Sequence, residues 1–168
     1  MSALTAIDRM DIHELLSRYA WSLDTGDEEG FVGCFSRDAE LVWDVFAVTG
    51  RWRGHAALRR FIAYFKSRPE SAGRQHHVSN VIIAAAAQGA TARSYVFVAL
   101  RSGEGPHRLN VMGYYEDELV REAGSWRLAR RVIRDWSGPV LARFAGQDGA
   151  RSTRELPAPL QELWATQG

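Results

Sequence analysis

The second half of the chain contains four strand-like runs in succession, and this series limits the fold more than any other feature. The runs are rich in β-branched and aromatic residues, as strands are, and they cover residues 77–85, 91–100, 108–121 and 125–136. Three short connections separate them, and each has the composition of a turn: AQGA, SGEGPH and EAGS. Consecutive strands joined by short turns predict an antiparallel meander.

The chain begins with a helical pattern over residues 5–23. Thr5 and Asp8 have the spacing of an N-terminal cap, and Gly26 is suited to end the helix. Apolar side chains recur at three- and four-residue steps, at Ile7, Met10, Leu15, Leu16, Tyr19 and Leu23. We therefore expect this face of an amphipathic helix to pack on the core.

Two more helices and a strand follow before the meander. EEGFVGCF, residues 28–35, predicts a short helix, and the apolar and aromatic segment at 38–46 predicts a strand. RWRG, residues 51–54, is interpreted as a turn. Residues 55–67 predict a third helix, which Pro69 ends because proline cannot continue it.

This order of elements predicts an α+β fold. We expect three N-terminal helices packed on a curved antiparallel or mixed sheet, as a cone-like barrel that encloses an apolar pocket. Such a pocket is the default ligand site of a small domain. The length of 168 residues fits a single domain, 1–168. Residues 138–168 form a C-terminal extension, whose apolar start, GPVLARF, is expected to cover the pocket mouth.

Charge and composition argue against several kinds of partner. The chain carries 21 basic and 20 acidic residues, so a net charge of +1 gives no basic footprint for nucleic acid or a membrane surface. We find no signal peptide and no run of about 18 apolar residues. Cys34 is the only cysteine and cannot form an internal disulfide. We expect a cytoplasmic protein with a small-molecule partner, no nucleic acid and no membrane.

Three stretches of the sequence resemble a known family, the SnoaL-like branch of the nuclear transport factor 2-like superfamily. The stretches are DIHELLSRYAWSLDTGDEEGFVGCFSRDAEL, GRQHHVSNVII and GYYEDELVREAGSWRLARRVIRDW. The resemblance covers roughly residues 5–137. Within the branch, the chain is similar to cofactor-free lyases: lindane dehydrochlorinase, bile-acid 7α-dehydratase and, more distantly, scytalone dehydratase. Because this fold carries unrelated chemistries, the resemblance is more specific for fold than for function.

The resemblance implies a catalytic set. Lyases of this branch use a histidine base oriented by an aspartate, at positions that hold His76 and Asp24 in this chain. A polar residue five places before the aspartate corresponds to Tyr19, and an arginine five places after the Trp of the last strand corresponds to Arg131. It also implies a homodimer or homotrimer that forms through the open face of the sheet, where we expect Tyr115 and Trp136 to be exposed.

The chemistry of these residue types agrees with that set. Imidazole titrates near neutral pH and can remove and return a proton. A carboxylate on one ring nitrogen fixes the tautomer and stabilises the imidazolium. A tyrosine hydroxyl can donate a hydrogen bond, and an arginine can hold an oxyanion. The histidines lack metal-ligand spacing such as HExxH, and β-elimination or dehydration by this set needs no cofactor. We therefore expect a lyase without cofactors.

Other side chains are candidates for the substrate-binding walls of the pocket. They are Trp43, Asn80, Tyr95, Asn110, Met112 and Tyr114. His76 could instead bond the backbone, and Tyr19 could be a core residue. The sequence does not decide which of four arginines on the last strand faces the pocket: Arg127, Arg130, Arg131 or Arg134.

Three functions stay open at this point. The first is a cofactor-independent lyase or dehydratase, or a related proton-transfer enzyme, acting on a small hydrophobic, aromatic or polycyclic compound. The second is a non-catalytic β subunit of a ring-hydroxylating dioxygenase, which would share the fold. The third is a polyketide-cyclase-like ligand-binding protein. Neither the substrate nor the leaving group follows from the residues.

Overall fold

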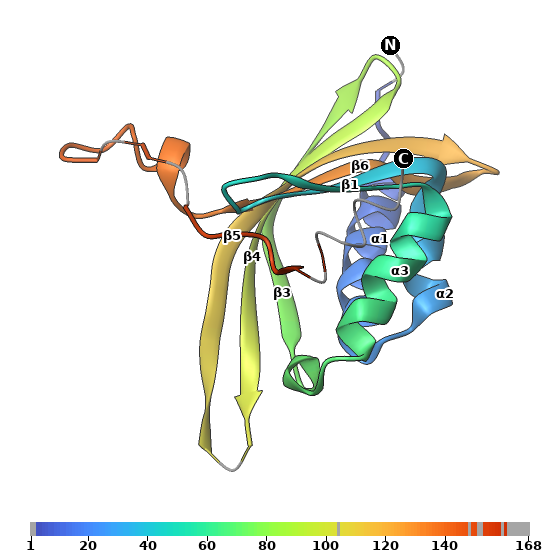
Figure 1. Ribbon diagram of the computed structural model, residues 1–168. Helices are drawn as coiled ribbons and strands as arrows, with labels where there is room; N and C mark the ends of the chain where they lie inside the picture. Colours follow the sequence, from blue (N-terminus) through green and yellow to red (C-terminus); the bar gives the residue numbers. More distant parts are fainter. Residues whose placement is uncertain (1–2, 104, 148, 151–152, 159, 161–168) are drawn as a thin grey trace.

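The computed structural model describes residues 3–103, 105–147, 149–150, 153–158 and 160. In this part of the chain, three helices lie on one face of a six-stranded, strongly curved sheet (Figure 1). The predicted α+β class with a curved mixed sheet is therefore confirmed. The sheet is not closed: strands β2 and β3 are its two edges, so the cone-like barrel is open on one side.

The described helices follow the sequence pattern closely. They are α1 (Ala6–Thr25), α2 (Glu28–Gly33) and α3 (Gly54–Lys66), with the 3₁₀ turns η1 (Pro69–Ser71) and η2 (Gly138–Val140). Thr5 and Asp8 form the predicted capping box at the start of α1, and Gly26 ends the helix with φ 69°. None of the described helices is long and apolar enough to cross a membrane.

The strands form one sheet in the order β2-β1-β6-β5-β4-β3. They are β1 (Phe35–Asp44), β2 (Gly50–Arg53), β3 (Gln75–Ala86), β4 (Gly89–Ser102), β5 (Gly105–Glu122) and β6 (Ser125–Asp135). The predicted meander of β3 to β6 is confirmed, while β1 pairs with β6 in parallel. The prediction of a turn at RWRG was wrong: residues 51–53 belong to β2, where alternate residues are buried and Trp52 pairs with Leu41 on β1, and Gly54 begins α3.

The expectation for the first turns of α1 was wrong at two positions. Ile7 and Met10 are 69% and 71% exposed. The side chain that faces the sheet there is Asp8, whose carboxylate accepts hydrogen bonds from Trp126 Nε1 and Arg121. The apolar face of α1 begins at Ile12, so the start of this helix is held on the sheet by polar contacts.

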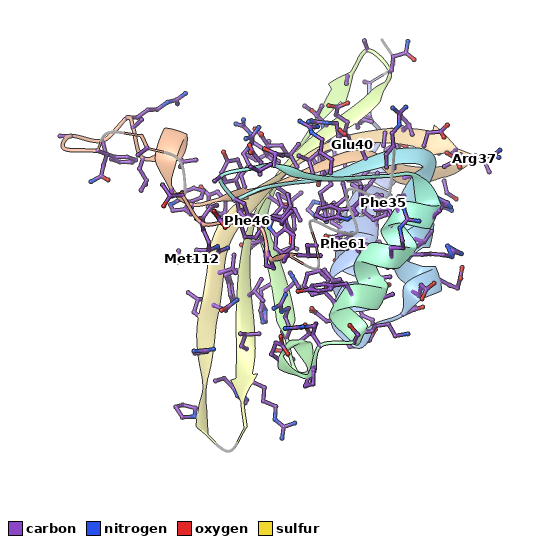
Figure 2. The ribbon with its side chains drawn as sticks, in the orientation of Figure 1. Phe35, Arg37, Glu40, Phe46, Phe61 and Met112 are labelled. Atoms are coloured by element: carbon purple, nitrogen blue, oxygen red, sulfur yellow. The ribbon has the colours of Figure 1, made fainter. Side chains whose placement is uncertain are left out.

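The core fills the space between the helices and the concave face of the sheet. Tyr19, Phe31, Phe35 and Phe61 are buried, and neighbouring rings among them lie 5.3 to 6.0 Å apart. Figure 2 shows Phe61 on α3 and Phe35 on β1 within this layer. Aromatic rings bury large areas and favour tilted contacts of this kind. They fix α1, α2 and α3 against β1.

The segment after β6 does not take the predicted position at the pocket mouth. Val140 and Arg143, from GPVLARF, lie on the outer face of the sheet. The chain then returns, and Arg154 reaches the inner face, where its carbonyl accepts a hydrogen bond of 2.8 Å from the backbone N–H of Ala47. Leu156 and Leu160 are buried in the core. Part of the predicted C-terminal extension, 161–168, lies outside the described residues.

Candidate active site

Asp24 and His76 form a hydrogen-bonded pair. Asp24 lies in the last turn of α1, and His76 is the second residue of β3. His76 Nδ1 is 2.5 Å from Asp24 Oδ1, and the backbone N–H of His76 donates to Asp24 Oδ2 at 2.7 Å. One carboxylate thus fixes both the strand and the ring, in the pairing that the family resemblance implies.

This geometry determines which ring nitrogen can act as a base. An ionised carboxylate only accepts hydrogen bonds, so Nδ1 of His76 carries the proton. In the neutral ring Nε2 then has the free lone pair, and the described residues give it no hydrogen bond. The side chain is 9% exposed and lines a cavity. Nε2 is therefore the nitrogen available to a molecule in the cavity.

The cavity lies between the C-terminal halves of α1 and α3 and the inner face of the sheet, with a volume of about 270 Å³. Three predicted wall residues line it: Trp43, Asn110 and Met112. Asn110 and Met112 are exposed and mark the rim. Most of the remaining wall is apolar or aromatic: Leu23, Val45, Phe61, Phe65, Val96, Val98, Val111, Tyr115 and Ile133. The site is suited to a small, mostly apolar compound.

The other three predicted wall residues do not line this cavity. Asn80, Tyr95 and Tyr114 lie on the opposite face of the sheet, in a hollow of about 650 Å³ that we call the outer hollow. Its other lining residues are Val81, Ile82, Arg93, Ser94, Trp136, Val140 and Arg143. Successive strand residues face opposite sides, and Tyr95 therefore faces away from Val96, which lines the cavity.

The expected exposure of two aromatic residues is corrected as well. Tyr115 is only 2% exposed and faces the cavity. Trp136 is half-buried in the outer hollow, with its ring 4.8 Å from that of Tyr95. Ile82, Tyr95 and Phe97 expose apolar surface on the outer face, and the ring of Phe97 stacks on His77 at 4.6 Å. His77 thus points away from the site, as strand alternation predicts.

Tyr19 lines the cavity and is completely buried. Its hydroxyl has no hydrogen-bond partner among the described residues. Burial raises the pKa of this phenol to about 12. Tyr19 is therefore a neutral donor at physiological pH, and its hydroxyl is free to bond a ligand in the cavity.

Arg131 is the buried member of the four arginines on the last strand. Its Nε and Nη2 donate to Asp117 at 2.8 and 2.7 Å, and both side chains are 0% exposed. Its Cζ lies 4.0 and 4.1 Å from the ring centroids of Tyr19 and Tyr115. Arg131 is thus behind these rings rather than on the cavity wall, a position that does not favour direct contact with a substrate.

Three charged residues that the sequence did not single out line the cavity. They are Arg74, Asp135 and Arg154. A signal existed for Arg74, because it lies two residues before His76 and a strand places such residues on one side. Arg154 gave no signal, since its approach depends on the returning C-terminal segment. No group of three or more potential metal ligands occurs in the part of the chain that the structure describes.

Residues 5–132 match the family model of the SnoaL-like domain, and the chain belongs to this family. The fold and the family therefore agree with the resemblance found in the sequence. No curated protein matches the chain.

Solved structures with the same fold come from several bacteria. A Nostoc punctiforme protein of unknown function with a cystatin-like fold is 30% identical, with a TM-score of 0.70 over 83% of this chain and 100% of that one. A Mycobacterium tuberculosis protein of unknown function is 25% identical (TM-score 0.68, coverage 94% and 84%). A candidate scytalone dehydratase from Novosphingobium aromaticivorans is 22% identical (TM-score 0.65, coverage 90% and 94%) and shares the fold.

Proposed function

We propose that this protein is a cofactor-independent lyase or dehydratase, or a related proton-transfer enzyme, for a small hydrophobic compound with an aromatic or polycyclic ring. One observation carries the proposal: His76 lines an apolar cavity while Asp24 occupies its Nδ1. This arrangement leaves a basic nitrogen at a site large enough for a ring compound.

In the proposed elimination, His76 Nε2 removes a proton from the carbon next to the one that bears the leaving group. The electrons of the C–H bond form the new double bond, and the leaving group departs with its own bonding pair. In a dehydration, the departing hydroxide accepts a hydrogen bond from Tyr19 and takes up the proton from His76. The products are the unsaturated ring compound and water, and His76 is neutral again.

Asp24 and Arg131 have supporting roles in this mechanism. Asp24 holds the tautomer of His76 and stabilises the positive charge that forms on the ring. We assign Arg131 to positioning rather than to substrate binding, because its guanidinium packs against the rings of Tyr19 and Tyr115. Asp117 keeps that guanidinium in place through two hydrogen bonds.

A confirmed substrate and two variants test the proposal. Hydroxylated ring ketones are screened for loss of water by mass spectrometry. Replacing His76 with Ala is expected to lower kcat by about 10²–10⁴-fold, the usual contribution of a general base. The matched control is His13→Ala, because His13 is exposed on α1 and does not line the cavity. Unchanged turnover in the His76 variant would contradict the proposed mechanism.

The outer face favours the alternative that the chain assembles with other subunits. Ile82, Tyr95 and Phe97 expose apolar surface there, and such surface often marks an interface. We propose a homodimer or homotrimer through this face, and light scattering of the purified protein measures the mass directly. A dioxygenase β subunit would instead purify with a catalytic partner, and a polyketide-cyclase-like binding protein would hold ligand without turnover.

A further inference from the structure

Arg74 is a cavity-lining arginine that forms no ion pair in direct contact among the described residues. Its Cζ lies 5.3 Å from the centroid of the Phe65 ring. Its Nε is buried and has no hydrogen-bond partner in the described part of the chain. A buried donor of this kind costs free energy unless something bonds it. Arg74 therefore has hydrogen-bonding capacity that the protein itself does not use.

The local backbone explains why Arg74 reaches the cavity. Gly73 has φ 76°, and a Cβ at this position would lie 2.7 Å from Cβ of Arg101. The backbone N–H of Arg74 donates to the carbonyl of Ser71 at 3.2 Å, which closes the turn after α3. Arg74 directly precedes β3, two residues before His76, and both side chains line the cavity.

The acidic groups near the cavity are already engaged. Asp24 accepts from the ring and the backbone of His76. The two oxygens of Asp135 accept from the backbone N–H of Trp136 at 3.0 Å and the hydroxyl of Ser137 at 3.3 Å. A second cation, Arg154, also lines the cavity. Burial lowers the pKa of Arg74, while the nearby carboxylates of Asp24 and Glu70 act to raise it. Those two carboxylates are hydrogen-bonded to His76 and Arg68.

We propose that Arg74 binds an anionic oxygen of the substrate, a carboxylate or phenolate carried by the ring. The inference rests on the proposed function in taking this cavity as the substrate site. Arg74 would then have the anion-holding role that the family resemblance assigns to Arg131, whose Nε and Nη2 are bonded to Asp117 and which does not line the cavity. The cavity volume of about 270 Å³ lies just below the usual range for ligand sites, about 300–1,000 Å³, and suits a compound of one or two rings.

Two matched probes test this inference with the full-length chain. 2-Naphthoate carries a carboxylate, while 2-naphthamide has nearly the same shape and no charge. Isothermal titration calorimetry measures both Kd values for the wild-type protein and for Arg74→Gln. The charge control is Arg93→Gln, because Arg93 lies on the outer face and pairs there with Glu116.

We expect the wild-type protein to prefer naphthoate. Arg74→Gln should weaken naphthoate binding by about 10- to 100-fold, as loss of a hydrogen bond to a charged group does. Naphthamide binding should stay within about twofold, and Arg93→Gln should change neither. An equal loss for both probes, unchanged naphthoate binding, or no preference in the wild type would overturn the inference.

The binding readout separates this inference from the proposed reaction. His76→Ala removes the base but retains Arg74, so naphthoate binding should persist in that variant. If the His76 variant turns over substrate normally while Arg74→Gln loses naphthoate, the reaction mechanism fails and the anion site stands. If His76→Ala is inactive and Arg74→Gln binds naphthoate as the wild type does, the anion site fails alone.

Discussion

Two pairs, each made of one basic and one acidic residue, differ in their access to the cavity. His76 and Asp24 are 9% and 15% exposed, with the ring on the cavity wall. Arg131 and Asp117 are both 0% exposed and line no part of that cavity. The closest contacts are similar, 2.5 and 2.7 Å. Contact distance therefore does not distinguish the two pairs; a ring nitrogen that faces the cavity does.

The largest effect is expected where the buried pair loses one partner. Arg131→Met leaves the Asp117 carboxylate buried without its cation, and such a loss typically costs about 3–5 kcal/mol of unfolding free energy. Urea unfolding followed by tryptophan fluorescence measures it. Replacing both partners, R131M with D117L, should recover most of the loss because no uncompensated charge remains. A single variant as stable as the wild type would remove the distinction between the two pairs.

A smaller effect on stability and a larger one on catalysis are expected at the open pair. Asp24→Asn keeps the shape of the side chain but removes the charge that stabilises the imidazolium. The unfolding free energy should fall by about 1 kcal/mol, whereas kcat should fall by about 100-fold or more. Steady-state kinetics and urea unfolding on one preparation give both numbers. Asp38→Asn, at an exposed position on β1, is the control, and equal losses in the two variants would contradict a catalytic role.

The smallest effect concerns Tyr19, which lines the cavity and packs against Arg131. Its pKa is raised to about 12 in the folded protein by burial, above the ordinary value of 10.0. Above pH 10 the unfolded chain loses this proton first, so stability is lost as the pH rises from about 10 to about 12. Tyr115, whose pKa is raised in the same direction, adds to this trend.

Urea unfolding at pH 8 and at pH 11 measures the loss. Tyr19→Phe should make the stability less dependent on pH in this range and should also lower kcat, since a hydrogen-bond donor is lost. An unchanged pH dependence would show that Tyr19 does not titrate differently in the two states.

Local features of the site could be predicted from the sequence. The capping box and Gly26 fix the bounds of α1, so Tyr19 and Asp24 fall near its end. The turn before β3 places His76 beside Asp24 at the end of α1. The contacts between residues that are distant in the sequence could not be predicted. Four arginines on β6 look alike, and only the approach of Asp117 from β5 distinguishes Arg131.

A strand irregularity explains why Asn80 was misplaced. With strict alternation, Asn80 would share the inward side with His76. The register of β3 against β4 shifts between Ser79 and Ile82, and Asn80 has φ 51°. Before this bulge the even-numbered residues of β3 face the helices, and after it the odd-numbered residues do. Ile83 is therefore buried and Ile82 is exposed. A bulge depends on the partner strand as well as on the local sequence, and alternation alone could not locate it.

The parallel pairing of β1 with β6 has a consequence for how the chain folds. Phe35 pairs with Leu128, and Trp43 with Ile133. Strand β1 therefore cannot join the sheet until β6, about 90 residues later in the sequence, has been synthesised. Until residues 125–135 have left the ribosome, β1 and β2 have no sheet to join, and the helices can cover only part of their core. Contacts between such distant segments make folding slow. The nascent domain is therefore expected to stay susceptible to proteases until β6 is complete.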